Sequence, residues 1–164
     1  MDTKEEKKEI VVGMADIKVG EAPSVLLTNL GSCIGLCLYD PQRKIGGLLH
    51  LMMPSAGAAV NKSELKKAKY ADTGIQELLQ QLKNIYGVRV SDCSAKIFGG
   101  AKILQGNIHN IGMDNDAAVR AILKDLGIRV GACKTGGEKG YKLKFNLETG
   151  AVACQIFGEQ IQEF

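Results

Sequence analysis

The sequence predicts an α/β fold, a mixed, largely antiparallel β-sandwich flanked by helices. Three observations predict it: segments with the period-two alternation of strands towards both ends of the chain, two amphipathic helical segments between them, and 20 glycines against three prolines. So many glycines favour short strands and tight turns over a helical bundle. Because 164 residues suit one hydrophobic core, we expect a flexible leader over residues 1–8 and a single domain over residues 9–164.

The first four strands are expected in the N-terminal third of the chain. Residues 9–19 place Ile10, Val12 and Met14 on one face, which is the pattern of a half-buried strand. Three further apolar runs follow, and turn residues such as Asp40-Pro41 separate them. These runs are residues 24–30, 33–39 and 45–52.

A first helix is expected after a loop at residues 54–62. Apolar residues recur there at spacings of three and four until Gly87, a residue type that commonly ends helices. They are Ala71, Ile75, Leu78, Leu79, Leu82, Ile85 and Tyr86. A strand is expected next at residues 95–98, directly before Gly99-Gly100.

A second helix is expected at residues 114–126, with Asp114 or Asn115 as its N-cap and Gly127 as its stop. Its expected buried stripe consists of Val119, Ile122, Leu123 and Leu126. Strands then return at residues 128–133, 141–147 and 151–157. The last two alternate apolar and polar side chains around a Glu148-Thr149-Gly150 turn, which indicates a β-hairpin.

Composition argues against several functions. The net charge of +3 comes from 21 basic and 18 acidic residues spread along the chain, and aromatic residues are only 5%, so nucleic acid is not an expected partner. No apolar run approaches the ~20 residues of a membrane span, and the N-terminus lacks the apolar core of a signal peptide. We expect a cytoplasmic protein without membrane insertion. Without phosphate-loop, dinucleotide or H-E-x-x-H motifs, no cofactor or metal is predicted.

The five cysteines are irregularly spaced and are expected to be free thiols. Cys33 follows Gly31-Ser32, so it begins a strand directly after a turn. At such a position the thiol can project into a cleft while free backbone N–H groups of the turn point the same way, as an acyl-transfer site requires. A buried, unreactive cysteine is the commoner role for this residue type. The other four are interpreted as core fillers: Cys37, Cys93, Cys133 and Cys154.

The chain has two histidines. His50 lies in an apolar run at residues 46–53, where composition alone leaves open a catalytic role and a buried structural role. His109 lies among asparagines and glycine, and a surface position is favoured for it.

Two segments carry a family resemblance. Residues 30–41, LGSCIGLCLYDP, and residues 46–54, GGLLHLMMP, together resemble the CheD family of chemoreceptor glutamine deamidases. Further matches follow in family order at residues 69–72, 95–101, 110–112 and 135–137. The resemblance therefore extends over about residues 11–157.

The resemblance implies a cysteine hydrolase with a Cys, His and Thr site, in a sandwich similar to that of bacterial deamidating toxins. Cys33 and His50 fall on the first two positions, and Thr28 is the third candidate, although Leu27 stands where the family threonine often lies. Backbone N–H groups near Gly31 and Ser32 would hold the oxyanion. The implied reaction converts glutamine side chains of methyl-accepting chemotaxis receptors to glutamate.

The implied partners are the cytoplasmic helices of those receptors and a phosphatase of the CheC type. The same acyl-enzyme chemistry would also serve a receptor methylester. A non-catalytic regulatory module that docks a receptor or a CheC-type protein is the alternative. A general cysteine protease is disfavoured, because nothing in the sequence specifies a peptide-binding cleft.

Overall fold

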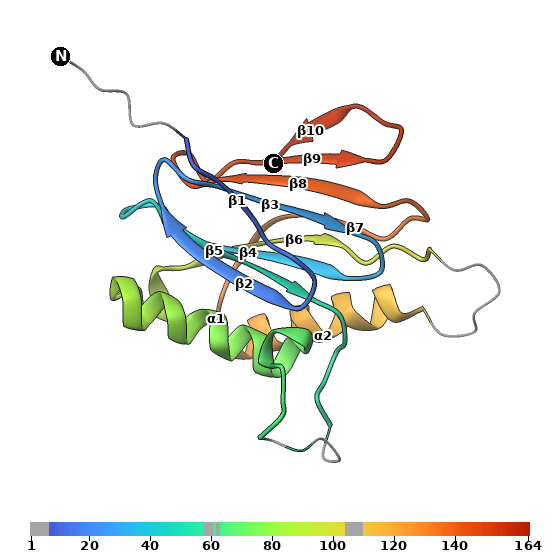
Figure 1. Cartoon of the computed structure of the whole chain (residues 1–164), viewed down its shortest axis with the longest axis horizontal. Helices are drawn as coiled ribbons and strands as arrows, with labels where there is room; N and C mark the ends of the chain where they lie inside the picture. The colour runs from blue at the N-terminus through green and yellow to red at the C-terminus, as the bar shows by residue number, and fades with distance from the viewer. Residues whose placement is uncertain (1–6, 58–60, 62, 104–109) are drawn as a thin grey trace.

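A computed structural model describes residues 7–57, 61, 63–103 and 110–164. Figure 1 shows three layers: an outer five-stranded sheet, a central five-stranded sheet, and two helices that cover the free face of the central sheet. The strand pairs β1–β3 and β6–β7 are parallel and the other pairs are antiparallel. The predicted fold class is therefore confirmed, with both helices on the same side of the sandwich.

The outer sheet has the order β1-β3-β8-β9-β10, and the central sheet has the order β2-β5-β4-β6-β7. The outer strands are β1 (Glu9–Val11), β3 (Val25–Leu30), β8 (Tyr141–Asn146), β9 (Val152–Ile156) and β10 (Ile161–Glu163). The central strands are β2 (Asp16–Glu21), β5 (Ile45–Leu51), β4 (Ile34–Asp40), β6 (Ser94–Gly99) and β7 (Val130–Thr135). The helices are α1 (Ala71–Tyr86) and α2 (Ile111–Leu126), with short 3₁₀ turns η1 (Lys67–Lys69) and η2 (Val90–Asp92).

The central sheet is buried on both faces, which explains why β4 and β5 are almost continuously apolar. Alternate residues of a strand point to opposite faces. Leu36 of β4 and Leu49 of β5 accordingly belong to the core beneath the helices, whereas Cys37 and Leu48 belong to the core between the two sheets. Every residue of β5 is buried, so a polar side chain on this strand must find its hydrogen-bond partner inside the sandwich.

The predicted strand at residues 9–19 is wrong in one respect, because this stretch forms two strands in different sheets. β1 pairs with β3 of the outer sheet, and β2 pairs with β5 of the central sheet. Between them the chain crosses the edge of the sandwich, with Ala15 at a φ of 53°. The crossing buries Val12 but leaves Met14 64% exposed, so the two residues do not share a face.

The second helix begins earlier than predicted, at Ile111. Its N-cap is Asn110, whose side chain accepts a hydrogen bond from the backbone N–H of Met113, rather than Asp114 or Asn115. Leu126, predicted to be buried, is 39% exposed at the last turn of the helix. Gly127 does end the helix, in the left-handed conformation that favours glycine.

Most other elements lie within two residues of their predicted bounds, including α1 with its stop at Gly87 and the hairpin of β8 and β9. Ile85 was wrongly assigned to the buried stripe of α1, since it is 60% exposed. Cys133 was wrongly interpreted as a core filler, because it is exposed on the edge strand β7. The short strand β10 was not predicted; its three residues are all exposed and carry no burial pattern. No helix of the described residues is long and apolar enough to cross a membrane.

Helix α1 lies very close to β5 at Gly47. A Cβ atom added to Gly47 would lie 2.5 Å from Leu78 Cδ1 and 2.9 Å from Val19 Cγ1, closer than real Cβ contacts. The glycine therefore allows the helix to pack directly on the strand backbone, which is one of the close approaches that the glycine content predicted.

We expect Gly47→Ala to lower the free energy of unfolding by about 1–3 kcal/mol, because Leu78 must shift within a packed core. Urea unfolding followed by circular dichroism measures this change. Gly131→Ala in β7 is the matched control, since the nearest atom to its added Cβ is Ala95 O at 3.8 Å, and it should stay within about 0.5 kcal/mol. Equal unfolding midpoints for the two variants would contradict this account of the packing.

Candidate active site

His50 projects from β5 into the space between the two sheets. It is only 2% exposed and pairs in register with Gly35 of β4. Cys33, two residues before Gly35, lies in the turn directly before β4 and packs in the core between the two sheets. This is the face from which His50 also projects, two residues from Leu48 of the same core. Diagonal neighbours of this kind lie about 7–8 Å apart along an antiparallel pair, within reach of long side chains. The fold thus brings the two sequence-predicted residues onto neighbouring positions of one sheet face.

The turn that carries Cys33 is fastened to the end of β6. Gly100 N–H donates to Cys33 O at 2.9 Å, and Ala101 N–H donates to Gly31 O at 3.0 Å. A Cβ atom on Gly99 would lie 2.4 Å from Cys33 O, and Gly99 has a φ of +99°. Only glycine tolerates both conditions, which explains why Gly99 is needed beside the cysteine turn.

Thr28 reaches His50 from the opposite sheet. Its Oγ1 atom, on β3, lies 2.8 Å from His50 Nδ1 and 2.7 Å from Val12 O. A carbonyl oxygen only accepts hydrogen bonds, so the single hydroxyl proton of Thr28 is donated to Val12 O. His50 Nδ1 must therefore carry a proton and donate it to Thr28 Oγ1. This tautomer leaves Nε2 as the basic nitrogen.

The segment that crosses between the sheets holds both of these residues. Val12 O accepts the Thr28 hydroxyl, and Ala15 N–H donates to His50 O at 2.9 Å. Val12 N–H in turn donates to Leu27 O at 2.7 Å. The residues 12–15 that interrupt the predicted first strand therefore form part of the support for the histidine.

Burial makes the cysteine and the histidine neutral at pH 7. It lowers the pKa of His50 from 6.5 to about 4, and it raises the pKa of the Cys33 thiol, an effect partly opposed by the hydrogen bond from the residue's own backbone N–H. His50 Nε2 is buried and has no hydrogen-bond partner among the described residues. The imidazole is thus held through Nδ1 and free to accept a proton at Nε2.

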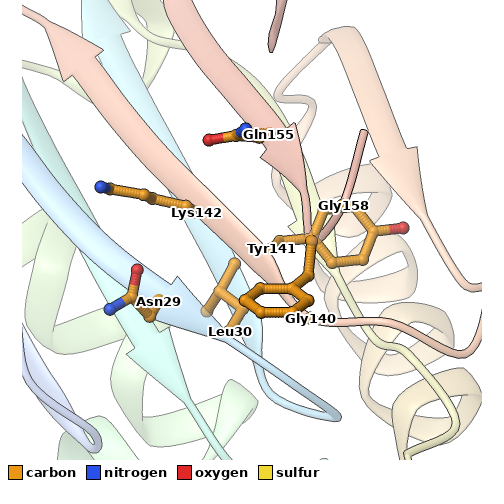
Figure 2. A pocket seen from close by; sticks show the side chains of 8 residues that line it. Asn29, Leu30, Gly140, Tyr141, Lys142, Gln155 and Gly158 are labelled. Atoms are coloured by element: carbon orange, nitrogen blue, oxygen red, sulfur yellow. The ribbon is translucent and has the colours of Figure 1, made fainter. Parts of the chain in front are cut away.

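One pocket is lined by His50 and Thr28, and a second pocket lies on the outer sheet. One, of about 310 Å³, is lined by the crossing segment together with Thr28, Asn29, His50 and Lys142. The other, of about 460 Å³, opens on the outer sheet, where polar side chains of three adjacent strands form a row: Asn29, Lys142 and Gln155 (Figure 2). Its wall includes Leu30, which directly precedes the cysteine turn. Asn29 and Lys142 therefore border both pockets.

Sequence reasoning missed the part that Asn115 plays in this region. The residue is fully buried in α2, and its Nδ2 atom donates to Ser32 O at 3.2 Å and to Met52 O at 3.0 Å. A signal was present in the sequence: Asn115, Val119 and Leu123 are spaced by four and share one helix face. A polar residue on an otherwise apolar face calls for buried partners.

Metal-binding clusters are not found in the described part of the chain, where no group of three or more His, Cys, Asp or Glu side chains could hold an ion. His109, predicted to lie at the surface, is outside the described residues. Gly31 and Ser32 form the turn before Cys33, and their role in holding an oxyanion stays a prediction.

A cysteine directly before a strand, on the same sheet face as a neutral histidine whose ring nitrogen is hydrogen-bonded to a threonine hydroxyl, is the arrangement expected of a cysteine hydrolase. The sequence also matches a family model described as CheD chemotactic sensory transduction, over residues 52–156. The chain belongs to the CheD family.

Named relatives are similar over nearly the whole chain. A probable chemoreceptor glutamine deamidase CheD of Desulforamulus reducens is 40% identical over 159 residues, which is 94% of each protein. The chemoreceptor glutamine deamidase CheD of Thermotoga maritima is 37% identical, over 93% of this chain and 96% of that protein. Among solved structures, the Bacillus licheniformis hypothetical protein YfiH overlaps 75% of this chain and 50% of its own with a TM-score of 0.47 and 18% identity.

We expect Thr28→Val to remove the preference of His50 for a proton on Nδ1, because the hydrogen-bond acceptor is lost. Thr28→Ser keeps the hydroxyl and should keep the preference. Long-range ¹H–¹⁵N correlation spectra of histidine-labelled protein report the tautomer, and His50→Gln assigns the signals. The assignment of the base would be overturned if the wild-type spectrum showed the proton on Nε2.

His50 should also make stability depend on pH. The unfolded chain takes up a proton at His50 below about pH 6.5, whereas the folded chain does so only near pH 4. Unfolding is therefore favoured as pH falls from 6.5 to 4, by at most about 3 kcal/mol. Urea unfolding at several pH values measures this loss, and His50→Gln should be less sensitive over the same range. Equal pH dependence of the two proteins would contradict a buried neutral His50.

Proposed function

We propose that this protein hydrolyses the side-chain amides of specific glutamines on methyl-accepting chemotaxis receptors, yielding glutamate and ammonia. The observation that carries the proposal is the buried His50, held at Nδ1 by Thr28 with Nε2 unpartnered among the described residues, on the same sheet face as Cys33. The names of relatives such as the Thermotoga maritima protein supply the substrate. Because receptor glutamines of this kind lie on cytoplasmic helices, a cytoplasmic location is part of the proposal.

The first step is attack on the amide. His50 Nε2 accepts the Cys33 proton while the sulfur bonds to the carboxamide carbon, and the carbonyl π electrons move to oxygen. Burial disfavours a lone imidazolium and a lone thiolate alike. The two charges therefore form together, at the moment when the substrate is in place and each charge stabilises the other.

The tetrahedral oxyanion needs hydrogen-bond donors. Backbone N–H groups of the turn at Gly31, Ser32 and Cys33 are the proposed donors, and one such donor typically contributes about 3 kcal/mol to the barrier reduction. The Cys33 N–H lowers the pKa of its own thiol, next to which the oxyanion forms.

Collapse of this intermediate releases ammonia. The imidazolium of His50 gives its proton to the departing nitrogen, and a glutamyl thioester remains on Cys33. A water molecule activated by His50 then hydrolyses the thioester, which restores the thiol and leaves glutamate. Thr28 orients the imidazole throughout, so its loss should slow the reaction rather than abolish it. The same acyl-enzyme chemistry would serve a receptor methylester as a side reaction.

One observation favours the alternative, a non-catalytic regulatory module. The pKa of the Cys33 thiol is raised by burial, which makes the resting thiol less reactive. In that case the pockets beside β3 would dock a receptor helix or a phosphatase of the CheC type without chemistry. The family resemblance supports a CheC-type partner under both functions.

Cys33→Ala should abolish conversion of receptor glutamines, a loss of roughly a thousandfold or more, because the thiol that forms the thioester is removed. The measurement is the amide-to-acid mass shift in peptides from receptor fragments incubated with purified protein, with and without a CheC-type phosphatase. Cys133→Ser changes an exposed thiol and should keep full activity. Wild-type rates in Cys33→Ala would reject the enzymatic function in favour of the binding module.

A further inference from the structure

We propose that Asn115 is a positioning residue, which orients the peptide unit between Ser32 and Cys33 and ties it to the strand that carries His50. This inference rests on the proposed function, since it assigns a role within the same site. Asn115 lies on α2, in the helical layer beneath the central sheet (Figure 1), and it is not one of the residues predicted to contact substrate.

Asn115 bridges two segments that are far apart in sequence. Its Nδ2 group donates to the carbonyl of Ser32, directly before the cysteine, and to the carbonyl of Met52, two residues after the histidine. A primary amide has two N–H donors, one for each carbonyl. Aspartate would place an acceptor against two acceptors, and alanine would leave both carbonyls without this partner.

The bond to Ser32 also fixes the direction of the Cys33 N–H. In a trans peptide unit the C=O and the following N–H point in opposite directions. Because Ser32 O points to Asn115, the Cys33 N–H points away from it, and this N–H acts on the thiol of its own residue by lowering its pKa. If the peptide unit rotated, the N–H would leave both the sulfur and the place where the oxyanion forms.

The first turn of α2 packs directly against the backbone at Gly100, and this contact fixes the position of Asn115. A Cβ atom on Gly112 would lie 2.3 Å from Gly100 O, so the first turn of the helix touches the same backbone that holds the cysteine turn. Gly100 N–H is the donor to Cys33 O, and Asn110 caps the helix. The motifs at residues 95–101 and 110–112, to which the reaction itself gives no role, therefore act together to place this side chain.

The test compares Asn115→Ala and Asn115→Asp with Val119→Ala, which removes buried volume one turn later on the same helix face. Both Asn115 variants should lower kcat for receptor deamidation about 10- to 100-fold with little change in KM, since misplaced reacting groups cost rate rather than binding. Val119→Ala should lower the melting temperature and keep kcat per folded molecule.

A second readout does not depend on the receptor reaction. The rate at which iodoacetamide alkylates Cys33, followed by peptide mass spectrometry across pH, reports the pKa of this thiol. The Cys33 N–H lowers the pKa of its own thiol. In Asn115→Ala the peptide unit is no longer held at Ser32 O and this effect weakens, so the alkylation profile should shift to higher pH; in Val119→Ala it should not. This readout still tests Asn115 if wild-type protein fails to deamidate receptors, an outcome that would reject the proposed function separately.

The inference would be overturned if Asn115→Ala kept both the wild-type kcat and the wild-type alkylation profile. An equal loss of kcat in Val119→Ala would also overturn it, because the effect would then be general loosening of the helix. If Asn115→Asp fails to fold, Asn115→Ala alone decides the question.

Discussion

A buried neutral imidazole needs a hydrogen-bond acceptor for the proton it carries. In this fold the facing sheet supplies the acceptor for His50, and the segment that crosses between the sheets hydrogen-bonds that acceptor in turn. His50 stands on a strand that is buried along its whole length, so its partner has to come from the facing sheet. Thr28 supplies it, and the proton of Thr28 is taken by Val12 in the segment that crosses between the sheets. One chain of hydrogen bonds thus joins the two sheets and sets which nitrogen of His50 is basic.

The cysteine side of the site depends on backbone contacts that glycine alone permits. Gly99 and Gly112 both lie where an added Cβ atom would collide with a carbonyl oxygen. These contacts bring the end of β6 and the first turn of α2 against the cysteine turn. A rigid turn of this kind can keep N–H groups aimed at one point, which electrostatic stabilisation of an oxyanion requires. The histidine is thus fixed by side-chain hydrogen bonds and the cysteine by backbone packing.

Segments with strong periodicity were predicted well, whereas a segment that passes from one sheet to the other was not. Helix α1 and the β8–β9 hairpin have regularly spaced apolar residues, and a glycine lies where the helix or the turn ends. The local sequence is therefore enough to predict these elements and their bounds. The stretch at residues 9–19 alternates like one strand, yet the chain leaves the outer sheet after Val11 and joins the central one at Asp16. Local alternation does not record which sheet a residue pairs with. Similarly, three residues before the expected start of α2 are helical because Asn110, not Asp114 or Asn115, caps the helix.

The sequence by itself determined the fold class and the family, and it marked Cys33 and His50 as the candidate reactive residues, because these depend on composition, periodicity and motifs that are local in the chain. Only the tertiary structure decided that Cys33 and His50 share a sheet face, since that follows from the pairing of Gly35 with His50 across β4 and β5. It also decided the proton on Nδ1, which depends on a hydroxyl of another sheet, and the contacts of Asn115 with carbonyls 83 and 63 residues away. Hydrogen bonds between distant segments leave no spacing in the sequence, so they are visible only once the chain has folded.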